Sequence, residues 1–325
     1  MFGRHWGMSD IQKGWPICSC VRAAEQGSVL ILPVTRAEDM GLRQLTMQAT
    51  QSQDEANMNT IYTCFPGGKH KVLTLSYDDG RLEDRHLVEI LNRHGIKATF
   101  HLNSGLCENP DRIPQSEWPS LYEGHEVACH TVTHPTIARC PIEHTAMQVL
   151  EDRRNLEAVM HYPVRGMSYP NGSYNDQITT LLPGLGIEYC RVVGNTDSFE
   201  MPQNYLLWKA TCHHNHNLLE NAERFVGLFK TQYLYLMYVW GHSYEFTADG
   251  NWDLMETFCE KVGNREDTWY ATNIQIVDYM KAAERLQCTV DGDVVYNPNQ
   301  CSIWLNVNGE GKEIRGGQTL NRYKM

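Results

Sequence analysis

From residue 60 onward, segments with the pattern of β-strands alternate with segments with the pattern of helices, and this alternation constrains the fold more than any other feature. Apolar and β-branched runs predict strands at 71–77, 97–102, 126–129, 187–193 and 234–240. Apolar residues at helical spacing predict helices at 82–91, 146–160, 218–229, 252–262 and 274–286. Such alternation is typical of an α/β protein with a parallel sheet, either open or closed into a barrel.

The two ends of the chain differ from this middle part. Residues 1–57 show no sustained helix or strand period, so we expect a poorly structured N-terminal extension; alternatively, the true start of the protein lies near Met58. Residues 58–287 hold the alternating pattern and form the expected main domain. Short apolar runs and an Asn308-Gly309 turn signal predict that residues 288–325 form a small β-rich appendage.

Charge and cysteine usage exclude several classes of function. The 28 Lys and Arg against 39 Asp and Glu give a formal net charge of −11 without any basic run, so no nucleic-acid partner is expected. No apolar run is long enough to span a membrane. The cysteines form no CxxC pair and several lie in apolar runs, which favours reduced thiols and a cytoplasmic location. An extracellular location is the alternative if the N-terminus is wrongly assigned, and the oligomeric state stays open.

Three predicted strands end in residues that bind metals or carry protons, and the carboxyl ends of parallel strands form the usual ligand site. The first ends in Asp78-Asp79-Gly80, where a turn at the glycine lets both carboxylates approach one point; a solvated turn is the alternative. The second is followed by His130 and His134, and one helical turn would put both imidazoles on the same side. The third delivers His242, a candidate general acid.

Two histidines and one aspartate form a ligand set for catalytic zinc, which takes three protein ligands and keeps one position open. Taken alone, the pair of His130 and His134 has a coincidental surface arrangement as its alternative. The segment 212–216 also contains metal-binding residue types, but a substrate-contacting loop or a plain surface loop is favoured there over a second metal site. Glu245 follows His242 closely and either orients its imidazole or is solvated.

The same segments resemble, in order, the motifs of the polysaccharide deacetylases, which share the chitooligosaccharide deacetylase homology domain and form carbohydrate esterase family four. The similar segments are Thr74-Leu75-Ser76-Tyr77-Asp78-Asp79-Gly80, His130-Thr131-Val132-Thr133-His134-Pro135, Met167-Ser168-Tyr169-Pro170-Asn171-Gly172 and Val239-Trp240-Gly241-His242. The resemblance covers about residues 70–245. It implies a distorted (β/α) barrel of the glycoside hydrolase/deacetylase type, with residues 58–287 as its catalytic domain.

The resemblance also implies a role for each matched residue. One divalent metal, expected to be zinc, would be bound by Asp79, His130 and His134. Asp78 would be the general base that deprotonates the attacking water, and His242 would be the general acid that protonates the leaving amine. The substrate or the oxyanion would be contacted by Tyr169, Asn171 and Trp240.

Two departures from the family pattern concern the orientation of these groups. The third motif of the family often carries an arginine that orients the base. Here that position is Ser168, and Arg165 is a candidate substitute. The fourth motif, a segment with aspartate and tryptophan, has no clear match; Asp197 and Trp208 are the candidates.

The sequence therefore predicts a metal-dependent hydrolase of non-peptide carbon–nitrogen bonds. Its expected substrate is an N-acetylated sugar or polysaccharide, or another small acetylated amide. One alternative is a non-catalytic carbohydrate-binding relative, and the presence of all five metal-binding and catalytic residues argues against it. The other is a metal-dependent esterase or a different amidohydrolase on the same fold.

Overall fold

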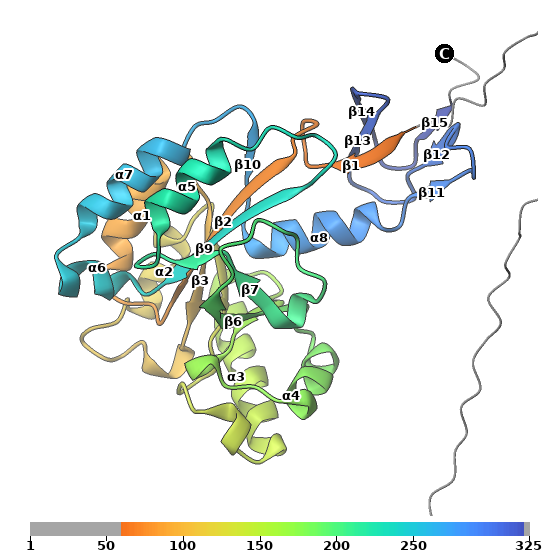
Figure 1. The fold of residues 1–325 in the computed structure, drawn as a ribbon. Coiled ribbons are helices and arrows are strands. Elements are labelled where there is room, and N and C mark those ends of the chain that lie inside the picture. Colours follow the sequence, from red (N-terminus) through yellow and green to blue (C-terminus); the bar gives the residue numbers. More distant parts are fainter. Residues whose placement is uncertain (1–59, 322–325) are drawn as a thin grey trace, which may run out of the picture. The chain divides into compact units, whose positions relative to one another are not determined.

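A parallel β-sheet forms the centre of the computed structural model, which describes residues 60–321 (Figure 1). The predicted N-terminal extension, residues 1–57, lies outside this range. Eight strands follow the order β7-β6-β5-β4-β3-β2-β9-β8, β10 pairs with β2, and each pair is parallel. The strands are Lys71–Asp78 (β2), Ala98–Leu102 (β3), Glu126–Cys129 (β4), Gly166–Ser168 (β5), Tyr189–Asn195 (β6), Trp208–Ala210 (β7), Cys212–His213 (β8), Tyr235–Gly241 (β9) and Thr268–Tyr270 (β10).

The sheet curls toward a barrel but is not closed by a continuous ladder. Its two end strands, β7 and β8, are separated in the sequence by Thr211 alone. The Thr211 amide donates to the Tyr238 carbonyl of β9 at 2.8 Å, so the chain passes from β6 to β9 at this point. The structure thus confirms the predicted α/β class and the distorted barrel, in an open form.

The α-helices lie outside this sheet, and α1, α5, α6 and α7 gather along one side of it in Figure 1. The α-helices of the described residues are Asp84–Arg93 (α1), Trp118–Leu121 (α2), Ile142–Met160 (α3), Asp176–Leu181 (α4), Leu218–Val226 (α5), Ser243–Asp249 (α6), Trp252–Val262 (α7) and Asn273–Ala283 (α8). The helix expected from residue 146 begins earlier, at Ile142. Its first turn follows Pro141, which suits a helix start, but that turn is too polar to show the helical period.

Alternate residues along the strands pack on opposite faces of the sheet, as strand geometry requires. On β9, Met237 and Val239 belong to the larger buried cluster beneath the helices, whereas Tyr238 and Trp240 belong to a second cluster on the other face. This second face also holds polar groups: the Thr74 hydroxyl, for example, donates to Asn273 Oδ1 of α8 at 2.8 Å. The inside of the curled sheet can therefore hold charged side chains with partners.

The start of α8 closes one end of this interior. The Asn273 amide donates to Thr99 Oγ1 at 3.0 Å, and the Ile274 amide donates to Glu126 Oε2 at 2.9 Å. These bonds satisfy amides that have no partner within the helix. The opposite end, where β2, β4 and β9 finish, has partly exposed side chains, among them Asp79, His134 and His242.

Two small antiparallel sheets complete the described chain, in the orders β1-β13-β14 and β11-β12-β15. Asn308 and Gly309 both have positive φ, at 54° and 93°, which confirms the predicted hairpin turn. The first strand of the described chain pairs with β13, a contact that the sequence pattern did not predict. The strands are Ile61–Cys64 (β1), Gln287–Cys288 (β11), Val294–Tyr296 (β12), Ile303–Val307 (β13), Glu310–Ile314 (β14) and Thr319–Asn321 (β15).

None of the helices within residues 60–321 has the length and apolarity needed to span a bilayer.

Candidate active site

The first part of the site is the turn at the end of β2. Asp78 is the last residue of the strand, and Asp79 and Gly80 follow it in the left-handed region, with φ of 82° and 62°. The Asp79 amide donates to the His101 carbonyl at 2.8 Å, which fixes this turn. Because the backbone reverses here, neighbouring carboxylates that would point to opposite faces of a strand reach the same edge of the sheet.

The second part is the loop after β4, and here the expectation of a helical turn is wrong. Residues 130–134 are not helical, since Thr131 and His134 have φ of 65° and 57°. Asn103 Nδ2 donates to the carbonyls of His130 and Thr131 at 2.6 and 3.0 Å, and Asp152 Oδ2 accepts from the His130 amide at 3.0 Å. These contacts stabilise a backbone shape that a β-branched residue rarely adopts. The two imidazoles nevertheless lie close together, with ring centroids 4.7 Å apart.

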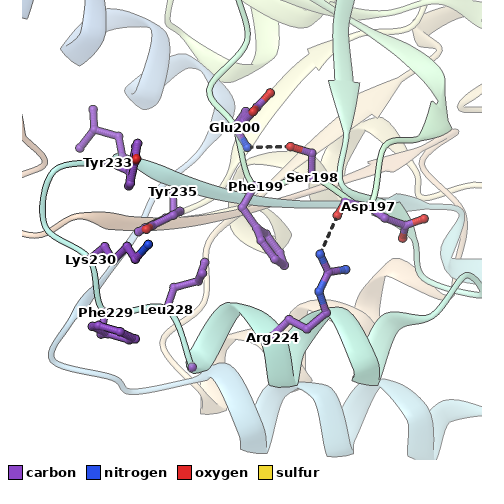
Figure 2. A pocket seen from close by; sticks show the side chains of 12 residues that line it. Asp197, Ser198, Phe199, Glu200, Arg224, Leu228, Phe229, Lys230, Tyr233 and Tyr235 are labelled. Carbon is purple, nitrogen blue, oxygen red and sulfur yellow. Dashed lines mark hydrogen bonds between the residues drawn. The ribbon is translucent and has the colours of Figure 1, made fainter.

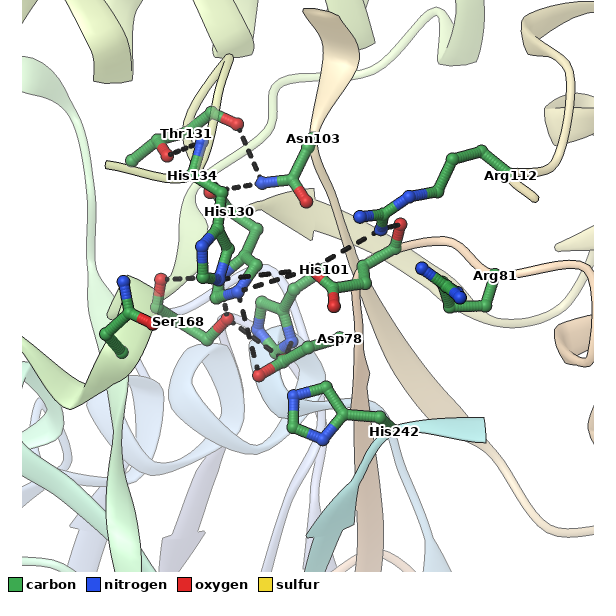
Figure 3. Close-up of polar contacts among 12 residues, drawn as sticks. Asp78, Arg81, His101, Asn103, Arg112, His130, Thr131, His134, Ser168 and His242 are labelled. Carbon is green, nitrogen blue, oxygen red and sulfur yellow. Dashed lines mark hydrogen bonds and ion pairs between the residues drawn. The ribbon is translucent and has the colours of Figure 1, made fainter. Parts of the chain in front are cut away.

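The turn and the loop bring the three predicted metal ligands together. Figure 3 shows two of them, His130 and His134, near Asp78. Asp79 Oδ1 lies 3.9 Å from His130 Nε2 and 3.9 Å from His134 Nε2. This oxygen is buried and accepts no hydrogen bond from the described residues, although the Arg112 guanidinium lies 3.4 Å away. A buried carboxylate oxygen without a hydrogen bond, facing two imidazole nitrogens, fits a divalent metal of the zinc class.

The protonation of His130 also fits metal binding. Its Nδ1 lies 3.0 Å from the Ser168 carbonyl and 2.6 Å from the Ser168 hydroxyl, so Nδ1 carries the proton and Nε2 keeps its lone pair. Burial lowers the pKa of His130 to about 4, and Asp78 and Asp79 only partly oppose this effect. The ring is therefore neutral at pH 7, as a metal ligand must be.

Asp78 lies beside these ligands and is held by three other side chains. Its Oδ1 accepts from the Ser168 hydroxyl at 3.0 Å and lies 3.3 Å from His101 Nδ1, while its Oδ2 pairs with the Arg191 guanidinium. Burial alone would raise the pKa of Asp78, but Arg191, His130 and His101 hold it well below its usual range. Asp78 is thus a fixed, ionised carboxylate next to the candidate metal site.

Arg191 is the residue that sequence reasoning missed. It comes from β6, is fully buried, and lies with its guanidinium 4.4 Å from the Trp240 ring. The proposed substitute, Arg165, instead pairs with Glu188 and Asp278 away from the site. The sequence does contain one sign of this role. Arg191 is a cation inside the apolar strand 187–193, and a buried cation requires a charged or polar partner.

The third part of the site is His242, directly after β9. Its Nδ1 lies 3.2 Å from Glu245 Oε1, and its amide donates to Glu245 Oε2 at 3.2 Å at the start of α6. Burial alone would lower the pKa of His242, but the bond to Glu245 and the nearby Asp78 and Asp79 carboxylates raise it. Glu245 is therefore not a solvated residue; it holds the candidate acid.

Neither candidate for the missing fourth motif reaches the site. Asp197 pairs with His216 at 2.9 Å and lines the separate cavity of about 530 Å³ in Figure 2, where Phe199 and Arg224 also lie. Trp208 is buried, and its ring packs against tyrosines, including Tyr238 at 5.0 Å. This cavity contains none of the predicted metal-binding or catalytic residues.

The three predicted substrate contacts differ in accessibility. Trp240 is mostly buried, and its ring centroid lies 6.1 Å from that of His242. Asn171 is exposed and donates through Nδ2 to Thr136 Oγ1 at 3.2 Å. Tyr169 is buried, its hydroxyl donates to the Leu206 carbonyl and its amide donates to the Arg191 carbonyl, so in this conformation neither group is free for a substrate.

Gly241 is required by close packing rather than by its backbone angle. A Cβ at this position would lie 2.0 Å from Nδ1 of His214, a ring that is itself fully buried. We expect Gly241→Ala to lower the free energy of unfolding by about 1–3 kcal/mol through overpacking, and to reduce activity because His242 is the next residue. Urea denaturation measures the first effect. Gly184→Ala is the control, since no atom lies within 4 Å of its added Cβ.

Part of this chain is similar in sequence to known deacetylases. A family model described as polysaccharide deacetylase matches residues 66–190. The chitooligosaccharide deacetylase of Sinorhizobium fredii is 28% identical over 147 residues, which are 45% of this chain and 62% of that protein. The peptidoglycan-N-acetylglucosamine deacetylase of Listeria monocytogenes is 29% identical over 112 residues, which are 34% of this chain and 23% of that protein. The chain thus matches less than two thirds of the length of both relatives.

A solved structure agrees with the fold. The proposed polysaccharide deacetylase of Mycobacterium smegmatis aligns with a TM-score of 0.53 at 15% identity, over 68% of this chain and 93% of that one. The segment matched by the family model contains Asp78, Asp79, His130 and His134, and it ends directly before Arg191.

Proposed function

Because this chain carries a domain of the polysaccharide deacetylase family, we propose that it hydrolyses the N-acetyl group of an acetylated sugar or polysaccharide. One observation carries the proposal: the donor set of Asp79, His130 and His134 lies beside the ionised carboxylate of Asp78. His130 Nε2 is 3.8 Å from Asp78 Oδ2, so a base adjoins the ligand site. His242, with its raised pKa, supplies an acid at the end of a neighbouring strand.

The residues fit a divalent metal, and we propose zinc. Asp79, His130 and His134 would hold it, through one carboxylate oxygen and two Nε2 atoms. When bound, such an ion polarises the amide carbonyl and makes water more acidic.

The proton transfers of the reaction are carried out by side chains of the protein itself. Asp78 accepts the proton of the attacking water, while Arg191 and Ser168 keep its carboxylate in one orientation. His242 donates a proton to the nitrogen that leaves, and its raised pKa keeps a larger protonated fraction at neutral pH. A separate base and acid allow hydrolysis without a covalent intermediate.

The test is acetate release combined with a metal assay. The substrate panel contains acetylated chito-oligosaccharides, simple N-acetyl sugars and acetylated xylan, and the last member reports ester hydrolysis. Acetate release from the N-acetyl substrates supports the proposal. Release from xylan alone would show an esterase instead, and release from none would contradict the proposed function.

We expect His130→Ala to lose the bound divalent ion and with it all metal-dependent activity, because two ligands rarely hold zinc. Elemental analysis of the purified protein should give one ion per chain in the wild type and none in the variant. His144→Ala, an exposed histidine on α3, is the matched control and should retain the ion. Retention of the ion by His130→Ala would mean that the metal lies elsewhere.

A further inference from the structure

The imidazole of His242 is the first member of a hydrogen-bonded chain that extends away from the metal ligands. His242 Nδ1 lies 3.2 Å from Glu245 Oε1, and Glu245 Oε2 lies 3.0 Å from His213 Nε2. The three side chains come from the end of β9, from α6 and from β8. Glu245 is thus held from both sides, by two different elements of the barrel.

The tautomer of His213 follows from its second nitrogen. The Asn215 amide donates to His213 Nδ1 at 3.1 Å, so Nδ1 has the lone pair and the proton lies on Nε2. Nε2 therefore donates to Glu245. The same assignment argues against a metal at this place, although the donor atoms of His213, His214 and Glu245 lie close enough to one another for one. A neutral ring whose Nδ1 accepts a hydrogen bond has no lone pair on Nε2 to offer.

The side chain of His214 lies beside His213 and Glu245 but carries no charge. It is fully buried and stacked on Phe246, with ring centroids 4.1 Å apart. Burial lowers the pKa of His214 to about 3, so the ring is neutral. Its Nε2 lies 3.2 Å from Glu245 Oε2, but the contact lacks hydrogen-bond geometry. His214 is therefore a neutral ring packed beside Glu245.

We propose that Glu245 and His213 are positioning residues for the catalytic acid. Glu245 accepts the Nδ1 proton of His242, so that Nε2 is the nitrogen that delivers a proton to the leaving group. His213 fixes the Glu245 carboxylate in the orientation that this bond requires. The inference rests on the proposed deacetylase function, and it adds His213 to the contact between Glu245 and His242.

The charges around His242 agree with this assignment. Asp78 and Asp79 face it from the end of β2, Glu245 faces it from α6, and the Tyr244 ring lies with its centroid 5.4 Å away. Burial alone would raise the pKa of Glu245, but His213 and His242 lower it, so Glu245 stays ionised. Among these groups, Glu245 is the one with a hydrogen bond to the His242 ring.

The first experiment measures the imidazole of His242 directly, by an NMR titration of the metal-loaded protein. Removing a carboxylate at hydrogen-bond distance should lower the pKa of His242, and we expect a fall of about 1 to 3 pH units in Glu245→Gln. Glu245→Asp, which keeps the charge, should restore part of the shift and serves if Glu245→Gln does not fold. Because the titration needs no turnover, it stands even if acetate release fails. An unchanged pKa in both variants would overturn the proposal.

The second experiment follows kcat/KM against pH. The acid acts in its protonated form, so activity is lost as pH rises through its pKa, and Glu245→Gln should move this alkaline limb to lower pH by about 1 to 3 units. A variant that was only destabilised would lose activity without moving the limb. His213→Ala should move it in the same direction, and adding it to Glu245→Gln should cause little further change, because both act through one carboxylate. If the shifts caused by His213→Ala and Glu245→Gln were additive, the proposed link between His213, Glu245 and His242 would be contradicted.

His216→Ala is the matched control for His213→Ala. His216 belongs to the same segment but pairs with Asp197, so its removal should leave the pH profile unchanged. Elemental analysis decides whether His213 and Glu245 form a hydrogen-bonded pair or bind a metal together with His214. A second ion per chain that is lost in His213→Ala and kept in His130→Ala would overturn the proposal.

Discussion

Asp78→Asn is expected to lower kcat by about 10²- to 10⁴-fold, the usual contribution of a positioned general base. The amide of asparagine cannot accept the proton of the attacking water. The metal ligands Asp79, His130 and His134 remain, so one divalent ion per chain should be retained. Steady-state acetate release measures the first effect, and elemental analysis of the same sample measures the second.

Glu126→Gln is the control for this prediction, because it also replaces a buried carboxylate inside the curled sheet. Glu126 accepts hydrogen bonds from Thr99, Tyr189 and the Ile274 amide at the start of β4, the opposite end of that strand from His130. This change should cost stability and leave kcat of the folded protein close to the wild-type value. If Asp78→Asn retains full activity, the base is another group.

Arg191→Met should lower the free energy of unfolding by about 3–5 kcal/mol, because it leaves the buried carboxylate of Asp78 without its cation. Arg165→Met removes a partly exposed arginine that lies outside the site, and there we expect a loss of about 0–1 kcal/mol. Urea denaturation of both variants at pH 7 measures the difference. Similar values for the two would mean that the buried pair contributes no more than a surface pair. Arg191→Lys keeps the charge and should lie between them.

The decrease in the free energy of unfolding caused by Arg191→Met should also depend on pH. In the wild type the pKa of Asp78 is held below the unfolded value of about 3.9, so its stabilisation is present above that pH and is lost in acid. Without Arg191, burial becomes the dominant effect and the pKa rises. The variant is then destabilised as pH rises above about 4. The gap in stability between the two proteins should therefore widen from acid to neutral pH.

The fold and the metal ligands were accessible from the sequence because they depend on local pattern. The strand 71–77, the helix 252–262 and the hairpin at Asn308 each follow from the spacing of apolar or turn residues, and the structure contains all three. Asp79, His130 and His134 follow strands of one parallel sheet, and such residues meet at one edge.

The remaining parts of the site depend on contacts between distant segments. The left-handed backbone at Thr131 is imposed by Asn103 and Asp152, whereas propensity alone would not place a β-branched residue there. Arg191 on β6 reaches Asp78 on β2 because the sheet curls, although three strands lie between these two in the strand order. The sequence of any single segment does not reveal that order. The sequence leaves Glu245 either as a residue that orients His242 or as a solvated one, and the two hydrogen bonds between them decide for the first.

The pairing of β1 with β13 has a consequence for how the protein is made. Ile61 pairs with Val307, so nearly all of the described chain is synthesised between the two partners. Until the last segment leaves the ribosome, β1 has an unpaired edge, and such edges are sites of association with other chains. Contacts between residues so far apart in the sequence also form slowly. Premature termination before β13 should therefore yield a product that aggregates, even though it contains every residue assigned to catalysis.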